Sequence, residues 1–516
     1  MKNQALQVVA CAALVCLTIS SAQAQKSADT LRMTLNDPIQ GISYYLDPKT
    51  ETIFTSEMVY DCLIGYDEDT QKFQPLLAKS WKRIGETVLE FDLRDDVKWH
   101  DGKPFSAEDV VYTMNWLTDP KTPLRFKSYW AWIAKTEALG PHKVRITAKS
   151  PTPYDMARLA YLTVILPKHA HGVAKEKMAF SRKPIGTGMY KAVSVDAGRG
   201  IVMVRNTDYR HGGDVKPPSN IGKVVLRQIP EPGTRVAEFL AGQIDLLPRD
   251  TPLDQVEAMD TMPGVVVTAG QSTYYKYVAI NATGRSGLKP LEDIRVRKAI
   301  FMAINRDGLA EIAIGKLKNI ARPESMCWRS QAGCDYSVPL PKYDPAGAKK
   351  LLAEAGYPNG FDLTVTTFTN EGIRSVAEAI TGQLRKVGIR ASLEPMTLGA
   401  YRKKQGAGKL QIFAGGWPGG GMPDVTGTVR FFYNASPKIA YHNDKELKQL
   451  SIDVDRTMDE TKRKEIGRKL FDMGLERGYF MPTAPGPAVI IHREELKVKA
   501  GTMRGLNIDM SNVNWK

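Results

Sequence analysis

The sequence predicts an α/β protein with more than one structural unit, and three observations lead to this prediction. The chain has 516 residues, more than a single hydrophobic core usually serves. Beyond Leu288, helical and strand-like patterns alternate, as they do in a parallel sheet with crossover helices. Before that point, the clearest strand pattern, residues 88–94, is that of a half-buried antiparallel strand. We therefore expect lobes of different character.

The first 24 residues have the features of a secretory signal peptide. Lys2 is the only charge, an apolar run extends from Val8 to Leu17, and Ala22-Gln23-Ala24 is a small-residue cleavage site. The run is shorter than the ~20 residues that cross a bilayer, which argues against a membrane span. A lipid-attachment box ending at Cys11 is the alternative. We expect cleavage after Ala24 and export from the cytoplasm.

Charge and cysteine usage narrow the possible partners. The formal net charge is +15 without a basic stripe, so nucleic acid is not an expected partner. Cys327 and Cys334 lie seven positions apart in a proline-rich loop, and we expect a disulfide there, with free thiols as the alternative. Cys62 is expected to be a buried small hydrophobe. No Cys/His spacing resembles a zinc site, so no metal is expected.

The amino-terminal elements are expected from apolar periodicity. Residues 30–33 form a short strand, and "SEMVYDCLIGYD" has helical spacing with an apolar side made of Met58, Cys62 and Leu63. In "TVLEFDLR", the alternation puts Leu89, Phe91 and Leu93 on one face of a strand. These segments are expected to belong to the framework of the protein.

A cluster of polar residues in "HDGKPFSAEDVV" has two interpretations. Ser106 and Asp109 form a capping box for a helix whose buried side is Val110, Met114 and Leu117. His100, Asp101, Glu108 and Asp109 could be a metal or acid/base cluster. Each is also explained singly, as a turn residue or a carboxylate at a helix start. We expect a structural role.

In the carboxyl-terminal half, a strand–helix–strand unit indicates a parallel pair. Asp344-Pro345 begins a helix that ends at Gly356. The strand "FDLTVTT", a helix with an apolar side of Val376, Ile380 and Leu384, and the strand "GIRASLE" follow in order. A last helix is expected to begin with a capping box of Thr457 and Glu460. Its cationic residues Lys462, Arg463, Lys464, Arg468 and Lys469 are expected to form a solvated face.

The strand "LQIFAGG" leads into the loop "AGGWPGGGMPDVTG", which has five glycines between Gly415 and Asp424 around Trp417. Ligands bind at the carboxyl ends of strands in open α/β sheets, so a binding loop is the favoured interpretation. A flexible spacer and a phosphate cradle are the alternatives. The cradle is disfavoured because Met422-Pro423 stand where a lysine and a hydroxyl residue would have to be.

Sequence signatures of enzymes are absent. There is no G-x-S-x-G or H-E-x-x-H, the histidines form no helical pair, and "GTGMYK" has lysine at the third glycine position of a dinucleotide fingerprint. We expect no catalytic residues and no cofactor.

Taken together, the segments resemble the family 5 extracellular solute-binding proteins, the dipeptide- and oligopeptide-binding components of ABC importers. The resemblance covers nearly the whole chain after the signal. It rests on these segments in this order: "PLLAKSW", "LRDDVKWHDGKPFSAEDVVYTM", "PIGTGMY", "VRNTDY", "RVAEFLAGQIDLL", "YVAINAT", "IRVRKAIFMAINRD", "KYDPAGAKKLLAEAGYPNGFDLT" and the tryptophan loop.

The resemblance implies a periplasmic binding protein of type II, a hinged clamp of two lobes with a small additional α+β domain. Lobe I would comprise residues 25–68, 187–282 and 487–516, the extra domain residues 69–186, and lobe II residues 283–486. It also implies a periplasmic monomer that closes on a solute and docks on the permease subunits of an ABC importer.

The resemblance also implies site residues. Trp417 would pack against the solute, and Gly415, Gly416, Gly419 and Gly420 would let the backbone approach it. Arg374 matches an arginine that meets the ligand carboxylate in dipeptide-binding relatives. The aspartate that meets the peptide amine is replaced by Gly420, with Asp424 as the nearest substitute. Tyr45 completes the set of expected ligand contacts.

Three alternatives to peptide capture stay open. The solute could be an opine, an oligosaccharide, haem or a metal chelate, which other members of the family bind. An extracellular hydrolase would need a nucleophile or metal site that the sequence does not show. An envelope chaperone would use the cleft for unfolded chains and bind many sequences weakly.

Overall fold

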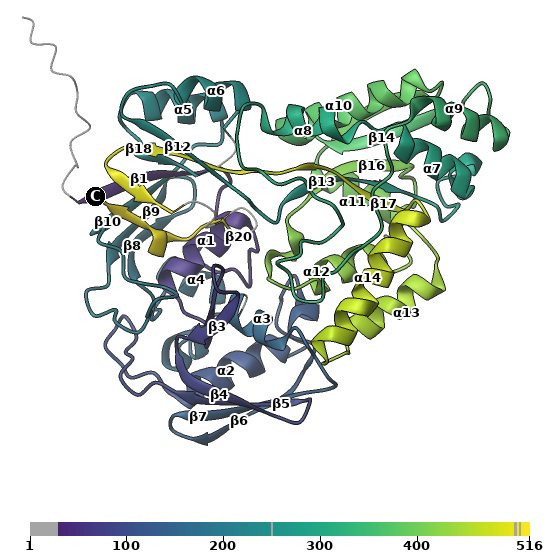
Figure 1. Cartoon of the computed structure of the whole chain (residues 1–516). Coiled ribbons are helices and arrows are strands. Elements are labelled where there is room, and N and C mark those ends of the chain that lie inside the picture. The colour runs from purple at the N-terminus through teal and green to yellow at the C-terminus, as the bar shows by residue number, and fades with distance from the viewer. Residues whose placement is uncertain (1–28, 162, 249–250, 500–502, 505–506) are drawn as a thin grey trace, which may run out of the picture.

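The computed structural model describes residues 29–161, 163–248, 251–499, 503–504 and 507–516. The expected signal peptide therefore lies outside the described residues. Three larger sheets organise the molecule (Figure 1), and each lies in a different part of it. We call the part around the seven-stranded sheet lobe I, the part around the five-stranded sheet lobe II, and the part around the four-stranded sheet the extra domain.

Lobe I is assembled from distant parts of the chain. Its strands are, in spatial order, β12 (Val265–Gly270), β18 (Ala488–Arg493), β11 (Leu246–Leu247), β1 (Thr30–Leu35), β10 (Lys223–Gln228), β9 (Gly200–Arg205) and β8 (Tyr190–Asp196). Strand β1 is parallel to β10 and β11, and the other pairings are antiparallel. The helices of this lobe are α1 (Thr50–Val59), α4 (Lys177–Arg182), α5 (Pro232–Leu240) and α6 (Leu253–Met259).

Lobe II contains the parallel pair that the sequence predicts. Its strands are β15 (Arg390–Met396), β14 (Asp362–Phe368), β16 (Ile412–Trp417), β13 (Tyr275–Ile280) and β17 (Phe480–Pro485). Strand β14 is parallel to β15 and β16, whereas β13 is antiparallel to β16 and β17.

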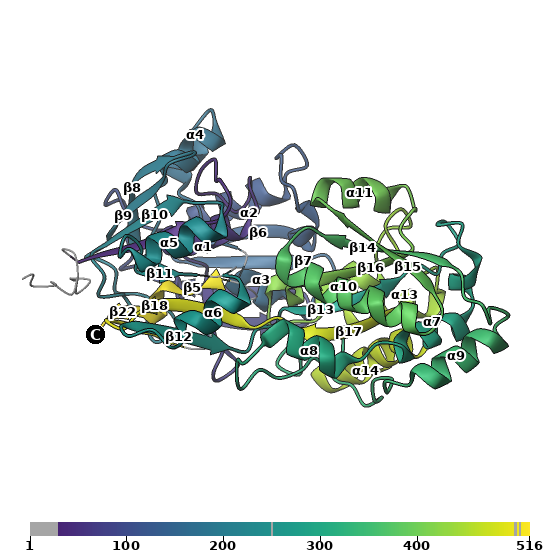
Figure 2. The ribbon, with the colours of Figure 1, turned by 90° about the horizontal axis from the view of Figure 1, so that it is seen from above.

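The helices of lobe II gather on its side of the molecule when it is seen from above (Figure 2). They are α7 (Ile294–Met302), α8 (Arg306–Ile314), α9 (Pro345–Glu354), α10 (Glu371–Lys386), α11 (Leu398–Gly406), α12 (Thr426–Thr428), α13 (Lys445–Val454) and α14 (Glu460–Glu476). Apolar residues pack on both faces of the sheet, because separate buried clusters contain alternate residues of β13. A sheet covered in this way is rigid enough to position a site at its edge.

The extra domain is an antiparallel sheet covered by one long helix. The strands are β4 (Ala78–Ile84), β5 (Val88–Leu93), β7 (Lys143–Ala148) and β6 (Ile133–Gly140), and the helices are α2 (Ala107–Thr118) and α3 (Asp155–Tyr161). Small two-stranded ribbons are β2 (Ile64–Asp67) with β3 (Lys72–Pro75), β19 (Leu496–Val498) with β22 (Val513–Trp515), and β20 (Met503–Arg504) with β21 (Asn507–Ile508). The extra domain and lobe I share one apolar core, so we expect them to move as one body.

The chain passes between the lobes at two adjacent places. The first lies between β12 and β13, residues 271–274, and the second between β17 and β18, residues 486–487. Ser272 Oγ donates a hydrogen bond to the carbonyl of Gly486, at 2.6 Å, and Gly486 N–H donates to the carbonyl of Tyr274, at 3.0 Å. Residues 275–280 were expected in lobe I, whereas they form β13 in the sheet of lobe II. Two short, adjacent crossings are the arrangement of a hinge.

Most local expectations agree with the structure. Ser106 and Asp109 form the capping box of α2, Asp344 caps α9 with Pro345 at its first turn, and Cys62 is buried without a disulfide. The helix expected to include Cys62 was wrong in its extent. Helix α1 ends at Val59, so Cys62 and Leu63 are not helical; Cys62 forms a bridge to Val164 instead.

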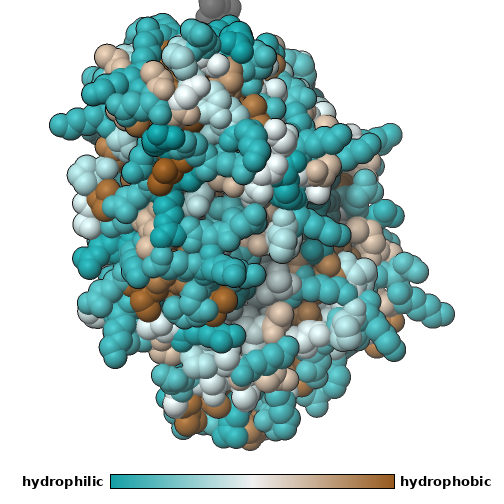
Figure 3. Space-filling model, turned by 90° about the vertical axis from the view of Figure 1, so that its right-hand side faces the viewer, coloured by the Kyte–Doolittle hydropathy of each residue, from teal (hydrophilic) through white to brown (hydrophobic). Residues whose placement is uncertain are grey.

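Helix α14 is capped by Asp459, whose side chain accepts from Lys462 N–H. The expected cap, Thr457, donates its hydroxyl to the carbonyl of Asp453 at the end of α13. The face of α14 is also not uniformly solvated, because Arg463 is fully buried. On the side of the molecule shown in Figure 3, hydrophilic residues predominate and the apolar ones are scattered. No helix among the described residues is long and apolar enough to span a bilayer.

Candidate ligand-binding site

The tryptophan loop begins where β16 ends, at the carboxyl edge of the parallel strands. Trp417 is half-buried, and its indole N–H donates a hydrogen bond to Thr428 Oγ1 at 2.8 Å. The indole stacks on the half-buried ring of Phe431, with centroids 4.4 Å apart and planes at 22°. The two rings form a partly exposed aromatic platform whose polar atom is satisfied, so its free faces are suited to an apolar or planar group.

Other residues pack closely against glycines of this loop. A Cβ at Gly416 would lie 1.8 Å from the hydroxyl oxygen of Tyr274, and a Cβ at Gly486 would lie 1.8 Å from Cδ1 of the same ring. Tyr274 therefore packs against the site loop on one side and against the hinge on the other. Gly419 has φ +66° and begins a single turn, Gly419–Gly421, that also contains Gly420. Gly415 is buried within β16.

The disulfide expected from the sequence is present and lies behind the loop. Cys327 and Cys334 are bonded, and the segment between them supplies Gln331. The Gln331 side-chain amide donates to the carbonyls of Gly419 and Met422, at 2.8 and 3.2 Å. Ala332 also exchanges backbone hydrogen bonds with Pro423 and Val425. The disulfide-closed segment thus holds the shape of the loop through the buried side chain of Gln331 and the backbone of Ala332.

Asp424 is committed to an internal partner. Both carboxylate oxygens accept from the guanidinium of Arg463 at 2.7 Å, and Asp424 Oδ1 also accepts from the Thr426 hydroxyl at 2.7 Å. The side chains of Asp424 and Arg463 are each 1% exposed. Because the carboxylate is buried and fully paired, it offers no open position to the amine of a solute in this conformation.

The two other expected contacts lie away from the loop. Arg374 is exposed on α10, where its Nε donates to Glu378 on the same helix at 2.9 Å. Tyr45 is buried among Tyr44, Trp116 and Trp130, and its hydroxyl donates to the carbonyl of Val164 at 2.6 Å. The structure therefore brings the loop residues together but does not add Arg374 or Tyr45 to them.

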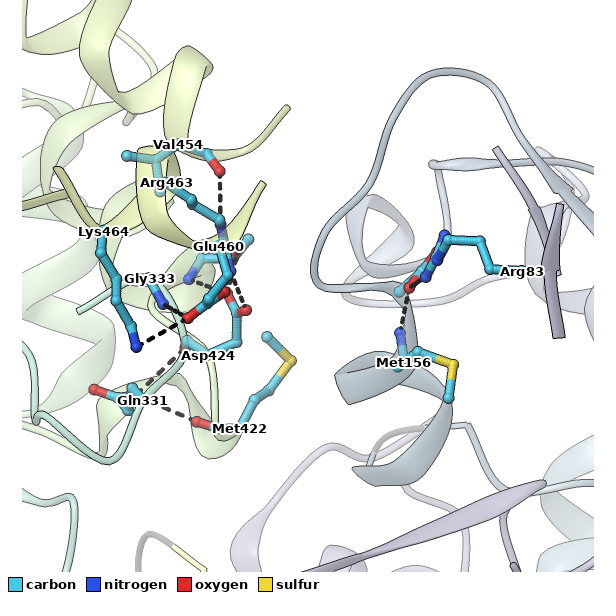
Figure 4. Close-up of polar contacts among 12 residues, drawn as sticks. Arg83, Met156, Gln331, Gly333, Met422, Asp424, Val454, Glu460, Arg463 and Lys464 are labelled. Carbon is cyan, nitrogen blue, oxygen red and sulfur yellow. Dashed lines mark hydrogen bonds and ion pairs between the residues drawn. The ribbon is translucent and has the colours of Figure 1, made fainter. Parts of the chain in front are cut away.

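Across from the loop, the extra domain contacts lobe II, and we call this contact region the seam. Arg430, which follows α12, donates to the hydroxyl of Tyr154, and its guanidinium carbon lies 4.6 Å from the centroid of that ring. Met422 of the loop belongs to the same buried cluster as Met156 of α3. Figure 4 looks into the space between the two sides, with Met422 and Asp424 on one and Met156 on the other. The loop and α3 therefore contribute side chains to one apolar cluster.

Electrostatics at the hinge and the seam are set by buried cations. Burial lowers the pKa of Lys276 to about 8, and its Nζ donates to the carbonyl of Pro485 at 3.0 Å, beside the second crossing. At the seam, Arg430 is paired with Asp455 at 2.6 Å. Among the described residues, no group of three or more histidine, cysteine, aspartate or glutamate side chains is placed to hold a metal ion.

Three residues of the platform and the seam were missed by sequence reasoning. Phe431 follows the loop in the aromatic run "RFFY", which is a signal that could have been used. Tyr154 has no distinguishing pattern. Arg158 is the only charge in "MARLAYLTVIL", and an isolated charge in an apolar segment indicates a buried functional or structural contact.

Comparison with known proteins identifies similar chains. Residues 72–438 match the model of the bacterial extracellular solute-binding proteins, family 5 Middle. The chain is 28% identical over 391 residues to the glutathione-binding protein GsiB of Pectobacterium atrosepticum, covering 72% of each chain. It is 27% identical over 403 residues to the heme-binding protein A of Haemophilus influenzae, covering 72% of this chain and 71% of that one.

A solved structure shows the same fold. The periplasmic binding protein DppA of Helicobacter pylori, associated with an ABC transporter and in complex with the peptide STSA, is similar with a TM-score of 0.75. The two chains are 24% identical, and the match covers 94% of this chain and 98% of that one. The named relatives are binding proteins with different solutes.

Proposed function

We propose that this chain, which belongs to the bacterial extracellular solute-binding proteins of family 5, captures a peptide or peptide-like solute. In the proposal, the solute is held between the two lobes in the periplasm. In the proposal it acts without catalysis and delivers the solute to the permease subunits of an ABC importer. The observation that carries the proposal is the partly exposed platform of Trp417 and Phe431, which lies at the carboxyl edge of the sheet.

The arrangement of the lobes supports a capture mechanism. The chain crosses between the lobes only at residues 271–274 and 486–487 within the described part of residues 251–499. Tyr274 joins these crossings to the site loop through Gly416 and Gly486. A solute that contacts the loop and the extra domain at once binds the closed form more tightly than the open one, and only such a difference shifts the equilibrium toward closure.

The identity of the solute is tested first. We would purify the protein from the periplasm of its own host, record native mass spectra, and identify what is released on denaturation. The proposal expects peptides or a peptide-like compound such as glutathione, which one relative is named for binding. If the mass does not change on denaturation, no ligand was bound tightly. This result would instead favour an envelope chaperone.

The site is tested by substitution. Trp417→Ala removes half of the platform and should weaken binding of the released solute by about 10- to 100-fold, because burial of an aromatic side chain contributes about 1.5–3 kcal/mol. Trp81→Ala, which removes a half-buried indole on β4 of the extra domain, is the matched control and should leave affinity unchanged. Arg374→Ala tests the expected carboxylate contact. Equal affinities for all these variants and the parent would show that the platform is not the site.

A non-peptide solute is the second candidate, and one observation favours it. In the peptide-binding pattern, a carboxylate of this loop meets the peptide amine. Here position 420 is glycine, and the nearest carboxylate, Asp424, is buried and paired with Arg463. A solute without a free amine, such as an opine, an oligosaccharide, haem or a metal chelate, fits this loop. Release of one such compound in the mass spectra would replace the peptide proposal.

A further inference from the structure

Arg158 is a buried cation without an internal counter-ion. It lies on α3 of the extra domain and is 1% exposed. Its Nε and Nη1 are buried and have no hydrogen-bond partner. Among the described residues, no aspartate or glutamate pairs with it. A charged side chain in this position is strongly disfavoured unless something neutralises it.

The one favourable contact of the guanidinium is with an aromatic ring. The guanidinium carbon lies 4.0 Å from the centroid of Tyr129, which is only half-buried. Such a cation–π contact offsets a fraction of the cost of removing a guanidinium from water. Burial lowers the pKa of Arg158, which agrees with an environment that lacks a negative charge.

The carboxylates near Arg158 already have other partners. Asp155, one turn earlier on α3, accepts from both terminal nitrogens of Arg83, at 2.7 and 2.9 Å. Asp455, across the seam, is paired with Arg430 at 2.6 Å. The backbone N–H of Arg158 donates to the carbonyl of Tyr154 at 3.0 Å, and the Tyr154 side chain accepts from Arg430. The protein therefore brings a second cation, and no free anion, to this position.

Arg158 lies at the seam, which a solute would occupy. Arg430 and Tyr154, which lies one helical turn before Arg158, form the contact between lobe II and the extra domain. Met156, two residues before it on α3, shares a cluster with Met422 of the tryptophan loop. The Arg430–Tyr154 hydrogen bond joins lobe II to the extra domain, so opening of the lobes requires this contact to break.

We propose that Arg158 is the residue that binds an anionic group of the solute, a carboxylate, and that it makes the protein selective for acids over their neutral amides. The proposal rests on the proposed function, since it names a contact of the same site. Nε and Nη1, which Arg158 leaves without partners, point to different sides of the guanidinium, so each can donate a charge-assisted hydrogen bond to an anionic oxygen. Arg374, expected for this role from the sequence, has Glu378 as its partner.

The first test needs no ligand. Arg158→Met keeps the length of the side chain and removes the charge. If Arg158 is retained for a solute, the ligand-free variant should melt at the same temperature as the parent or higher, because a buried charge without a partner is removed. Arg463→Met, which removes an equally buried but paired arginine, should lower the melting temperature by several degrees. A comparable loss in Arg158→Met would show a structural role and overturn the proposal.

The second test measures selectivity. A set of di- to tetrapeptides, glutathione included, is offered as free acids and as carboxyl-terminal amides, and affinities are measured by calorimetry. The parent should prefer the acid by about 10-fold or more, as expected for a charge-assisted pair. In Arg158→Met the preference should fall to within about 2-fold through loss of acid affinity. Arg468→Met, a charge-matched variant at an exposed position of α14, should keep it.

The outcomes separate the two proposals. If the parent binds acids but Arg158→Met keeps the same preference, the role of Arg158 is excluded while peptide capture stands. If the parent binds neither form of any peptide, peptide capture fails. The role of Arg158 is then decided by the melting temperature alone, because a loss comparable to that of Arg463→Met would show that Arg158 is structural. A parent that binds acids and amides equally also overturns the role of Arg158.

Discussion

Two arginines in this protein are buried to the same extent but differ in what surrounds them. Arg463 of lobe II and Arg158 of the extra domain are 0% and 1% exposed. Arg463 donates to both oxygens of Asp424 and, through Nε, to the carbonyl of Val454, as Figure 4 shows. Arg158 has a ring above it and no carboxylate. A paired buried charge belongs to the framework, whereas an unpaired one is open to a partner from outside.

The same contrast extends to the two sides of the seam. On the side of the loop, Gln331 and the disulfide-closed segment satisfy the carbonyls that the glycine-rich turn leaves free. On the side of the extra domain, Nε and Nη1 of Arg158 are buried without partners. The loop is thus held by internal hydrogen bonds, whereas the guanidinium of Arg158 is not. Four predictions test this contrast between paired and unpaired groups, in decreasing order of expected effect.

Asp424→Asn should have the largest effect. It leaves Arg463 buried beside a neutral amide, and breaking one partner of a buried pair costs about 3–5 kcal/mol. We would measure the free energy of unfolding in urea by tryptophan fluorescence. Asp362→Asn is a matched control, because Asp362 pairs with Arg390 at the same 2.7 Å but the two side chains are 85% and 58% exposed. The control should lose less than about 1 kcal/mol; equal losses would refute the contrast.

Removing the disulfide should have the next largest effect. The bond closes a loop with a sequence separation of 7, for which the loss of chain entropy predicts about 2.5 kcal/mol in the double variant Cys327→Ser/Cys334→Ser. Because Gln331 lies inside this loop, solute affinity should fall as well. The parent treated with a reductant should approach the double variant, and the double variant should not respond. If affinity survives in the double variant, the segment does not hold the tryptophan loop.

Acidification should weaken the extra domain through His171. Burial, followed by the charge of Lys177, lowers the pKa of this imidazole from 6.5 to about 3. The folded form therefore stays neutral while the unfolded chain takes up a proton below pH 6.5, so stability is present above that pH and is lost as the pH falls. From pH 7 to pH 5 the loss is about 2 kcal/mol.

The histidine is tested by comparing slopes. His171→Gln keeps an acceptor for the Tyr112 hydroxyl, which lies 2.6 Å from Nδ1. Its free energy of unfolding should depend less on pH between 5 and 7 than that of the parent. Parallel curves for the two proteins would assign the acid sensitivity to other groups.

The smallest effect is expected for the exposed pair on α10. Arg374 and Glu378 are 47% and 49% exposed and one helical turn apart, so Glu378→Gln should change the free energy of unfolding by no more than about 0.5 kcal/mol. The free energy of unfolding is measured in urea, as for Asp424→Asn, and the two losses are compared. A loss near that of Asp424→Asn would mean that exposure does not distinguish the two kinds of pair.

Local patterns predicted local structure well. The alternation in residues 88–94 gave β5, the Asp344-Pro345 start gave α9, and the strand–helix–strand order gave the parallel pair β14 and β15. The tryptophan loop was placed correctly at the end of β16 because the apolar strand pattern of "LQIFAGG" ends there. These features depend on residues close together in the chain.

The errors concern contacts between distant residues. Arg463 looks like a member of a solvated cationic face, and only its pairing with Asp424, 39 positions away, buries it. Cys62 continues an apolar helical pattern, but its bridge to Val164 ends the helix at Val59. The partnerless state of Arg158 is likewise a property of the surrounding fold. Burial and pairing of charges are decided by tertiary structure, which periodicity does not report.

The position of β18 has a consequence for how the protein is made. This strand comes from residues 488–493 and lies between β12 and β11 inside the sheet of lobe I. Lobe II, from β13 to β17, is contiguous and has all its strands before β18 is synthesised. Lobe I therefore contains the first strand of the chain but gains β18 only after lobe II has all its strands. An exported chain would keep its amino-terminal half unfinished until its last segment arrives, and folding of that half would follow translocation rather than compete with it.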